Sequence, residues 1–119
     1  ASDVYKRQLY KRKYWDVVNG DDLPDGVDYI VFDTAVNSGP GRALKLLQNA
    51  ISVAATGQID PRTMQDIKAM DPVLIINRFA AEREAYYKSL PTFETFGRGW
   101  LRRNEESRIA AIMMLAWIA

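Results

Sequence analysis

The sequence contains no cysteine and no histidine. Their absence excludes disulfide bonds, thiol nucleophiles, imidazole bases and the usual zinc ligand sets, so any acid–base chemistry must use carboxylates. Long apolar runs are also missing, because the longest, at residues 109–119, is much shorter than the roughly 20 residues that span a bilayer. We therefore expect no cofactor, no metal site and no membrane span, and nothing in the chain resembles a signal peptide.

An excess of charge of one sign is missing too. The 119 residues include 16 lysines and arginines against 15 aspartates and glutamates, which leaves a formal net charge of +1. This balance provides no overall basic field for nucleic-acid binding, so we expect no nucleic-acid partner. What is present is a composition of 48% hydrophobic, 26% charged and 11% aromatic residues, which is typical of one globular domain with a core.

Helical patterns in the first third of the chain point to an all-α fold, and the whole sequence predicts about five or six helices. Residues 3–15 form the first expected helix, and the glycine- and proline-containing stretch 19–28 is a loop that holds at most a two-stranded ribbon. Residues 29–36 are β-branched enough to resemble a strand. A helix is favoured there because Phe32 with Val36, and Asp33 with Asn37, are four residues apart.

The remaining helices are predicted from apolar spacing and from capping signals. Residues 42–54 repeat apolar side chains at helical spacing, and Thr56-Gly57 ends that helix. Asp60-Pro61 and Asp71-Pro72 each place an N-cap before a proline at the first helical position. The helix that starts at Pro72 should end near Pro91, and a last helix should run from about residue 98 to the end of the chain.

Two expectations concern packing. On the helix that starts at Pro72, the inward side chains should be Val73, Ile76, Phe79, Ala80, Tyr87 and Leu90. Arg83 lies on the same stripe, where we expect it to pair with Glu82 or with a carboxylate of the acidic loop. The apolar run 109–119 should be surrounded by protein, and any part left bare would favour self-association.

Five unusual strings follow one another along the chain. They are VFDTAVNSGPGRA at residues 31–43, GQIDPRT at 57–63, EREAYY at 82–87, and LPTF with FGRGWLRR within 90–103. Together they resemble the peptidoglycan-binding domain of glycoside hydrolase family 108, whose members are lysozyme-like muramidases, many of them phage endolysins. The resemblance implies a bacterial or phage protein that is made in the cytoplasm and acts on glycan strands of the cell wall or periplasm.

The resemblance also implies a division of the chain. Tyr14-Trp15 is similar to the end of the family's catalytic segment, so residues 1–28 are expected to be the tail of that segment and residues 29–119 the peptidoglycan-binding domain. The family's catalytic glutamate lies in a Glu-Gly-Gly-Tyr motif, which this sequence does not contain. Residues 2–8 resemble a translated sequencing adapter, which predicts a truncated chain whose partner is a missing N-terminal catalytic lobe. The alternative is an ordinary helical segment.

Glycoside hydrolysis usually requires a carboxylic acid of raised pKa and a second group across the sugar. The candidate carboxylates are Asp33, Glu82, Glu84, Glu94, Glu105 and Glu106. All except Asp33 share their faces with arginine or lysine, which favours the ionised form, and Asp33 stays open as a catalytic acid because its surroundings are apolar. We assign no catalytic residue in this chain.

The predicted substrate-binding residues are Asp33, Asn37, Trp100 and Arg103. Carboxylate and amide groups bind sugar hydroxyls, indole rings stack on sugars, and arginines pair with carboxylates. Asn37-Ser38-Gly39 is similar to a helix that borders the groove of other phage lysozymes. Local alternatives remain, in which Asn37 ends a helix, and Trp100 is a buried anchor beside arginines that bridge helices.

Three functions follow from these patterns. The first is the peptidoglycan-binding part of a muramidase without its catalytic glutamate, and the second is a carboxylate-dependent muramidase that is active as it stands. The third is a helical interaction module without wall binding. An upstream Glu-Gly-Gly-Tyr motif distinguishes the first two functions, and binding to purified sacculi distinguishes the first from the third.

Overall fold

The computed structural model describes residues 2–118. Its α-helices are α1 (Ser2–Tyr10), α2 (Val27–Ser38), α3 (Pro40–Ala50), α4 (Pro61–Ala69), α5 (Pro72–Lys88) and α6 (Phe93–Ile118). A π-helical segment, η1 (Lys11–Asp16), continues α1, and a 3-10 turn, η2 (Gly20–Asp22), follows it. Residues 2–118 contain no strand, so the all-α prediction is confirmed, and the loop before α2 holds a helical turn instead of a ribbon.

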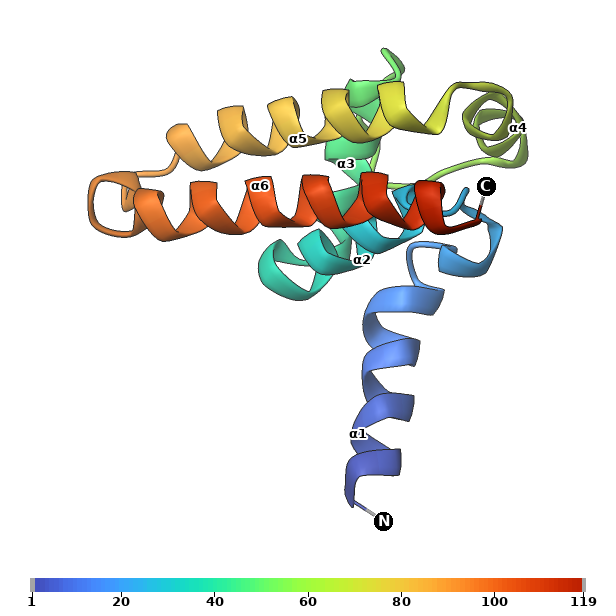
Figure 1. Ribbon diagram of the computed structural model, residues 1–119, viewed down its shortest axis with the longest axis horizontal. Coiled ribbons are helices and arrows are strands. Elements are labelled where there is room, and N and C mark those ends of the chain that lie inside the picture. The colour runs from blue at the N-terminus through green and yellow to red at the C-terminus, as the bar shows by residue number, and fades with distance from the viewer. Residues whose placement is uncertain (1, 119) are drawn as a thin grey trace.

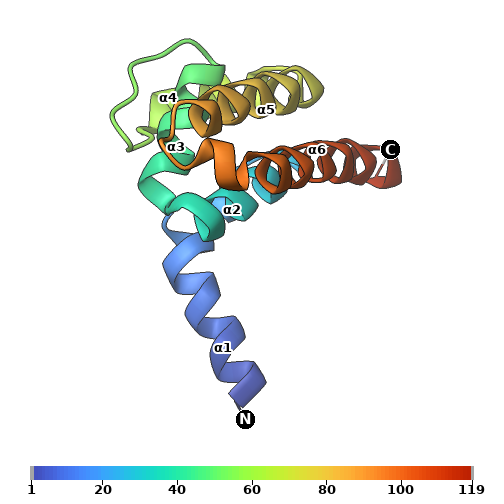
Figure 2. The same ribbon diagram turned by 90° about the vertical axis from the view of Figure 1, so that its left-hand side faces the viewer.

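The helices form a body from which the N-terminal arm projects. Helices α5 and α6 run antiparallel to each other and pack together closely, with α2 and α3 against them (Figure 1). Figures 1 and 2 both show α1 extending away from this body. No residue of α1 is buried, so the body is built almost entirely from the chain that follows η1.

Helix α2 lies at the centre of the body. It contacts α3, α5, α6, η1 and η2, and its buried side chains are Val27, Ile30, Val31, Asp33, Thr34 and Ala35. Burial on several sides explains why the sequence there is apolar enough to resemble a strand. The Thr34 hydroxyl, which is fully buried, donates to the Ile30 carbonyl at 2.8 Å and is therefore satisfied inside the helix. The prediction of a helix at residues 29–36 is confirmed.

Helix α3 ends earlier than its apolar spacing predicts. It ends at Ala50, and Ser52 has a left-handed backbone with φ of 64°. The Gln48 side chain holds the loop that follows, because its amide nitrogen donates to the Gln58 carbonyl at 2.8 Å and its oxygen accepts from the Gly57 N–H at 2.8 Å. The predicted continuation to residue 54 is therefore wrong, since side-chain hydrogen bonds replace the last helical turn.

Helix α6 starts five residues before the predicted position, at Phe93. Gly97 and Gly99 suggest an irregular start, but a Cβ on Gly97 would lie 2.5 Å from the Phe93 ring. The Phe93 ring, which lies one helical turn before Gly97, therefore packs over that glycine. The helix continues without a break through Gly97 and Gly99. The helix starts at Pro61 and Pro72 agree with the prediction, and the side chains of Asp60 and Asp71 accept backbone N–H bonds there.

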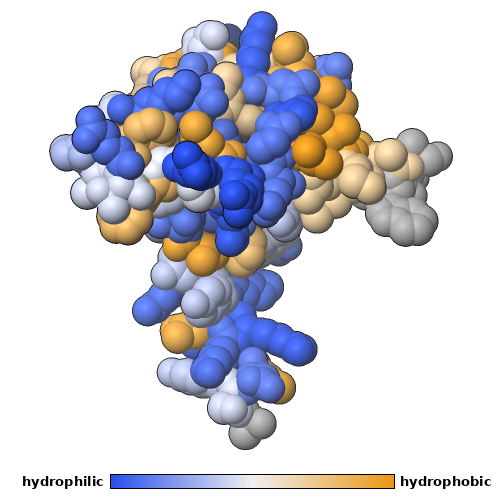
Figure 3. Space-filling view, turned by 60° about the vertical axis from the view of Figure 1, so that its left-hand side comes forward, coloured by the Kyte–Doolittle hydropathy of each residue, from blue (hydrophilic) through white to orange (hydrophobic). Residues whose placement is uncertain are grey.

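Some side chains are more exposed than predicted. Val73 is 37% exposed, whereas its neighbour Ile75 is fully buried, so the predicted inward position of Val73 is wrong. In the C-terminal run, Ala111 is buried but Ile109 and Met113 are 45% and 62% exposed. The expectation that protein surrounds this run is therefore wrong for these two side chains, and its last residue lies outside the described part. Figure 3 shows hydrophobic surface gathered near this end of α6.

No helix within residues 2–118 is both long enough and apolar enough to cross a membrane.

Candidate functional site

Asp33 is the centre of an ion-pair network that joins three helices. Its side chain is on α2 and is 5% exposed, while Arg83 comes from α5 and Arg103 from α6. Arg83 Nη1 lies 3.0 Å from Asp33 Oδ2, and Arg103 Nη2 lies 2.5 Å from Asp33 Oδ1. The Ser107 hydroxyl, one turn after Arg103, donates to Oδ2 at 2.8 Å. The four side chains therefore tie the central helix to the α5–α6 pair.

The partner of Arg83 differs from the one predicted. Arg83 is fully buried and pairs with Asp33, which is 50 residues away in the sequence, whereas Glu82 is its chain neighbour. Adjacent residues on a helix do not face each other, so a buried Arg83 requires a carboxylate from another element. The expectation of a packed arginine paired to a carboxylate is confirmed, but the partner is Asp33 on α2 and neither Glu82 nor a carboxylate of the acidic loop at residues 19–28.

The pKa of Asp33 is lower than the ordinary value of an aspartate. Burial alone would raise this pKa, but the hydrogen bonds from Arg103 and Ser107 and the positive charges of Arg83 and Arg103 lower it further than burial raises it. A general acid for glycoside hydrolysis needs the opposite shift. Asp33 is therefore ionised at neutral pH, and its geometry suits an electrostatic or binding role better than proton donation.

Tyr87 connects this network to Asn37. Arg83 Nε donates to the Tyr87 hydroxyl at 2.9 Å, and that hydroxyl donates to Asn37 Oδ1 at 2.8 Å. An arginine can only donate, so the Tyr87 oxygen must accept from Arg83 and its own proton is left for Asn37. This relay turns the Asn37 oxygen toward Tyr87 and leaves the Asn37 amide N–H groups for other partners. Asn37 is exposed, so those donors are accessible from solvent.

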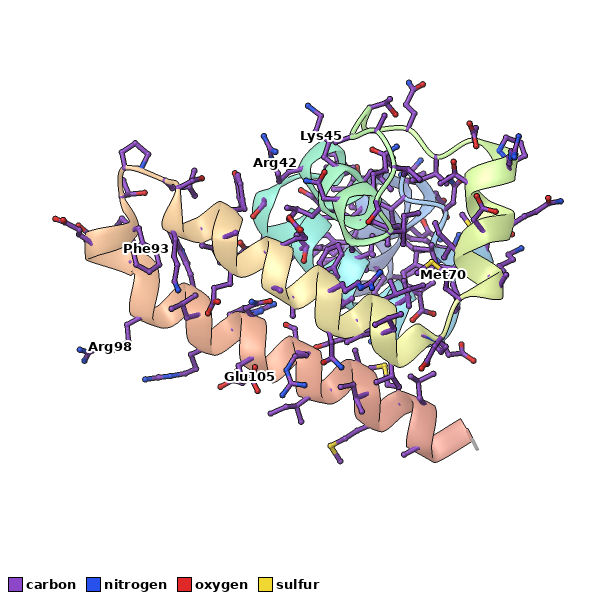
Figure 4. All side chains as sticks on the ribbon, turned by 90° about the horizontal axis from the view of Figure 1, so that it is seen from above. Arg42, Lys45, Met70, Phe93, Arg98 and Glu105 are labelled. Atoms are coloured by element: carbon purple, nitrogen blue, oxygen red, sulfur yellow. The ribbon has the colours of Figure 1, made fainter. Side chains whose placement is uncertain are left out.

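Trp100 extends the site along α6 as part of an aromatic row. Its ring centroid lies 5.3 Å from that of Tyr87 and 5.7 Å from that of Phe96, which is 53% exposed. Tyr86 lies 5.9 Å from Tyr87 on the other side. Arg42, at the start of α3 in Figure 4, lies 4.7 Å above the Tyr86 ring. Trp100 is half-buried, so it is only in part the buried anchor of the alternative interpretation, whereas Arg103 bridges α6 and α2 as that alternative expects.

The four predicted site residues lie together, but the two other arginines near Trp100, Arg98 and Arg102, do not join them. Asp33, Asn37, Trp100 and Arg103 are connected through Arg83 and Tyr87 by ion pairs, hydrogen bonds and ring contacts. Arg98 and Arg102 are exposed, and Figure 4 shows Arg98 pointing away from α5. Arg83, Tyr87 and Ser107 are the members that the sequence did not assign to the site. The spacing of four residues between Arg83 and Tyr87, and between Arg103 and Ser107, was a usable signal.

A second surface feature was not predicted from the sequence. A groove of about 380 Å³ lies where η1 meets α2, and it is lined by Arg7, Tyr10, Lys11, Trp15, Asp21 and Phe32. The Trp15 indole N–H donates to Asp21 Oδ1 at 2.8 Å, and the Trp15 ring contacts the Phe32 ring edge to face. Phe32 lines this groove, whereas the next residue on α2, Asp33, is buried in the ion-pair network.

These features define an all-helical, lysozyme-like domain with a charged and aromatic surface site on α2, α5 and α6. A search of solved structures finds similarity to SagA from Brucella abortus, with 40% sequence identity and a TM-score of 0.89. The match covers 93% of this chain and 64% of the SagA chain, so this chain spans less than two thirds of that protein's length.

The sequence profile of glycosyl hydrolase 108 matches residues 2–39, a segment that includes Asp33 and Asn37. Among curated proteins, none matches the chain. The profile and the SagA structure together support a relationship between this chain and the glycosyl hydrolase 108 family.

Proposed function

We propose that this chain is the peptidoglycan-binding part of a lysozyme-like muramidase, and that Asn37, Trp100 and Arg103 contact the glycan while Asp33 holds them in place. The family relationship supports a cell-wall substrate. The observation that carries the proposal is the single network in which Asp33 fixes Arg103 and the Arg83–Tyr87 relay orients Asn37. Residues held in this way lose little conformational entropy when a ligand binds.

The chemistry of these groups matches that of an N-acetylated glycan. The Asn37 amide N–H groups are donors for hydroxyl and acetyl oxygens, and Arg103, with a side chain that is 54% exposed, offers further donors. The Trp100 and Phe96 rings add an aromatic surface on which a sugar ring can stack. We further propose that the catalytic acid of such a muramidase comes from a segment outside residues 2–118.

Binding to insoluble peptidoglycan is the direct test. Asn37→Ala should reduce the fraction of protein that sediments with purified sacculi, because it removes the oriented amide. The free energy of unfolding should fall by only about 0.5–1.5 kcal/mol, the cost of the hydrogen bond that Asn37 accepts from the Tyr87 hydroxyl, so the variant should stay folded. The matched control is Asn49→Ala on the exposed side of α3, which should sediment like wild type. Equal sedimentation of all three proteins, or none by any of them, would contradict the proposed role of Asn37.

The same suspensions report whether the isolated chain cuts glycan. We expect no fall in turbidity, because Asp33 is ionised at neutral pH and therefore cannot donate the proton that the leaving oxygen needs. A muramidase of known activity, added to a parallel suspension, serves as the positive control. Clearing by the wild-type chain that is lost in a still-folded Asp33→Asn variant would show instead that Asp33 is the catalytic acid.

A further inference from the structure

The network around Asp33 contains more positive than negative charge. Two guanidinium groups, Arg83 and Arg103, share a single carboxylate. Among the described residues, Asp33 is the carboxylate that forms an ion pair with each of these arginines. An aspartate can neutralise only one of two arginines. The network is therefore one negative charge short of neutrality.

The positive charge in excess is concentrated at Arg103. Arg83 is fully buried, and its Nη1 takes the inner side of the carboxylate through Asp33 Oδ2. Arg103 binds the outer oxygen through Nε and Nη2, and its side chain is 54% exposed. Arg83 Nη2 is also buried and has no hydrogen-bond partner among the described residues. The buried side of the network, around Arg83, therefore has no free acceptor.

Neighbouring groups make the exposed side of Arg103 suitable for an anion. Tyr29, Asp33 and Asn37 are spaced four residues apart on α2 and therefore follow one face of that helix. The Tyr87 hydroxyl donates to the Asn37 oxygen, so it leaves the Asn37 amide N–H groups free to bond elsewhere. Arg103 is held at a fixed position by Asp33, so its guanidinium plane is ordered before any ligand arrives.

We propose that Arg103 binds a carboxylate of the peptidoglycan stem peptide, with the Asn37 amide beside it. The inference rests on the proposed function and adds the part of the wall polymer that the site recognises. A carboxylate is favoured because its two oxygens match a planar guanidinium and an adjacent amide donor. The bound carboxylate supplies the second negative charge, so the two arginines are then matched by two carboxylates and the network is neutral.

The first experiment uses a soluble probe. Chain labelled with ¹⁵N is titrated with N-acetyl-L-alanyl-D-glutamate, which carries free carboxylates, and in parallel with its diamide, which carries none. The diacid should shift the Arg103 Nε–H resonance, and the diamide should not. Arg103→Gln should weaken diacid binding by about three- to tenfold, which corresponds to a charge-assisted contact partly screened by solvent. Arg102→Gln removes the same charge from the neighbouring exposed position and should bind like wild type.

The second experiment separates this inference from the proposed function. Sacculi are amidated on their peptide carboxylates, which leaves the glycan intact, and sedimentation of the chain with native and amidated sacculi is compared. Reduced binding to amidated sacculi, with the difference absent in Arg103→Gln, supports the inference. Equal binding to both would keep glycan binding and overturn the carboxylate site. If the chain binds neither form of sacculi, the proposed function is contradicted. The titration with the soluble diacid then tests the carboxylate site on its own. An Arg103 resonance that the diacid leaves unchanged, or that the diamide shifts equally, overturns the inference in every case.

Discussion

Asp33→Asn is expected to lower the free energy of unfolding by about 3–5 kcal/mol, the largest single-residue loss that we predict. The substitution keeps the size of the side chain but removes its charge, so the fully buried Arg83 loses the carboxylate with which it pairs. A buried guanidinium without a counter-charge is much less stable than a solvated one in the unfolded chain. Urea-induced unfolding followed by far-UV circular dichroism measures the loss.

The control is Asp16→Asn, which breaks an ion pair of comparable length on the surface. Lys11 Nζ lies 2.9 Å from Asp16 Oδ1, but both side chains are largely exposed, so this loss should be small. A double variant, Asp33→Leu with Arg83→Met, should recover much of the stability, since apolar residues often replace a buried ion pair without cost. A loss for Asp33→Asn as small as that for Asp16→Asn would mean that Arg83 is stabilised in another way.

The dependence of stability on pH provides an independent check of the same ion pair. The pKa of Asp33 in the folded protein lies below its ordinary value of 3.8, so folding favours the ionised carboxylate. Its contribution to stability is complete above the unfolded-state pKa and is lost as the pH falls through the folded-state pKa. The difference in stability between wild type and Asp33→Asn should therefore be constant near neutral pH and should shrink below about pH 4.

Gly26→Ala is the second substitution with a large expected effect, a loss of about 2–4 kcal/mol. Gly26 precedes α2 with φ of 85°, a backbone conformation that alanine adopts only with strain. An added Cβ would also lie 2.6 Å from the Ala111 carbonyl oxygen on α6, and backbone at the centre of a helix cannot move aside easily. The substitution therefore pushes the start of α2 away from α6.

Gly41→Ala is the matched control for this prediction. Gly41 lies in the first turn of α3 with ordinary helical φ, and an added Cβ would meet no atom within 4 Å. Alanine there should raise the free energy of unfolding by about 0.4–1 kcal/mol, because it reduces the freedom of the unfolded chain. Urea unfolding of both variants measures the contrast. Similar changes for the two glycines would rule out the proposed contact between Gly26 and α6.

Local sequence signals were sufficient to predict most of the helices, and the sequence also drew attention to four residues that lie together in the candidate site. The Asp60-Pro61 and Asp71-Pro72 starts require only residues next to each other, because an N-cap bonds to its own first turn. The family resemblance in residues 31–43 and 96–103 likewise directed attention to Asp33, Asn37, Trp100 and Arg103, which the folded chain brings together. The sequence does not show which face each residue occupies, so it left Trp100 open between a buried anchor and a surface ring.

Only the tertiary structure decided which charges meet and where two helices touch. Asp33 and Arg83 are 50 residues apart and Asp33 and Arg103 are 70 apart, and no local pattern links such positions. The lowered pKa of Asp33, which argues against a catalytic acid, depends entirely on those distant arginines. Gly26 is likewise an ordinary loop glycine until α6 packs against it. Helix formation depends on neighbours in the chain, whereas burial and electrostatics depend on neighbours in space, and the function of this site depends on the latter.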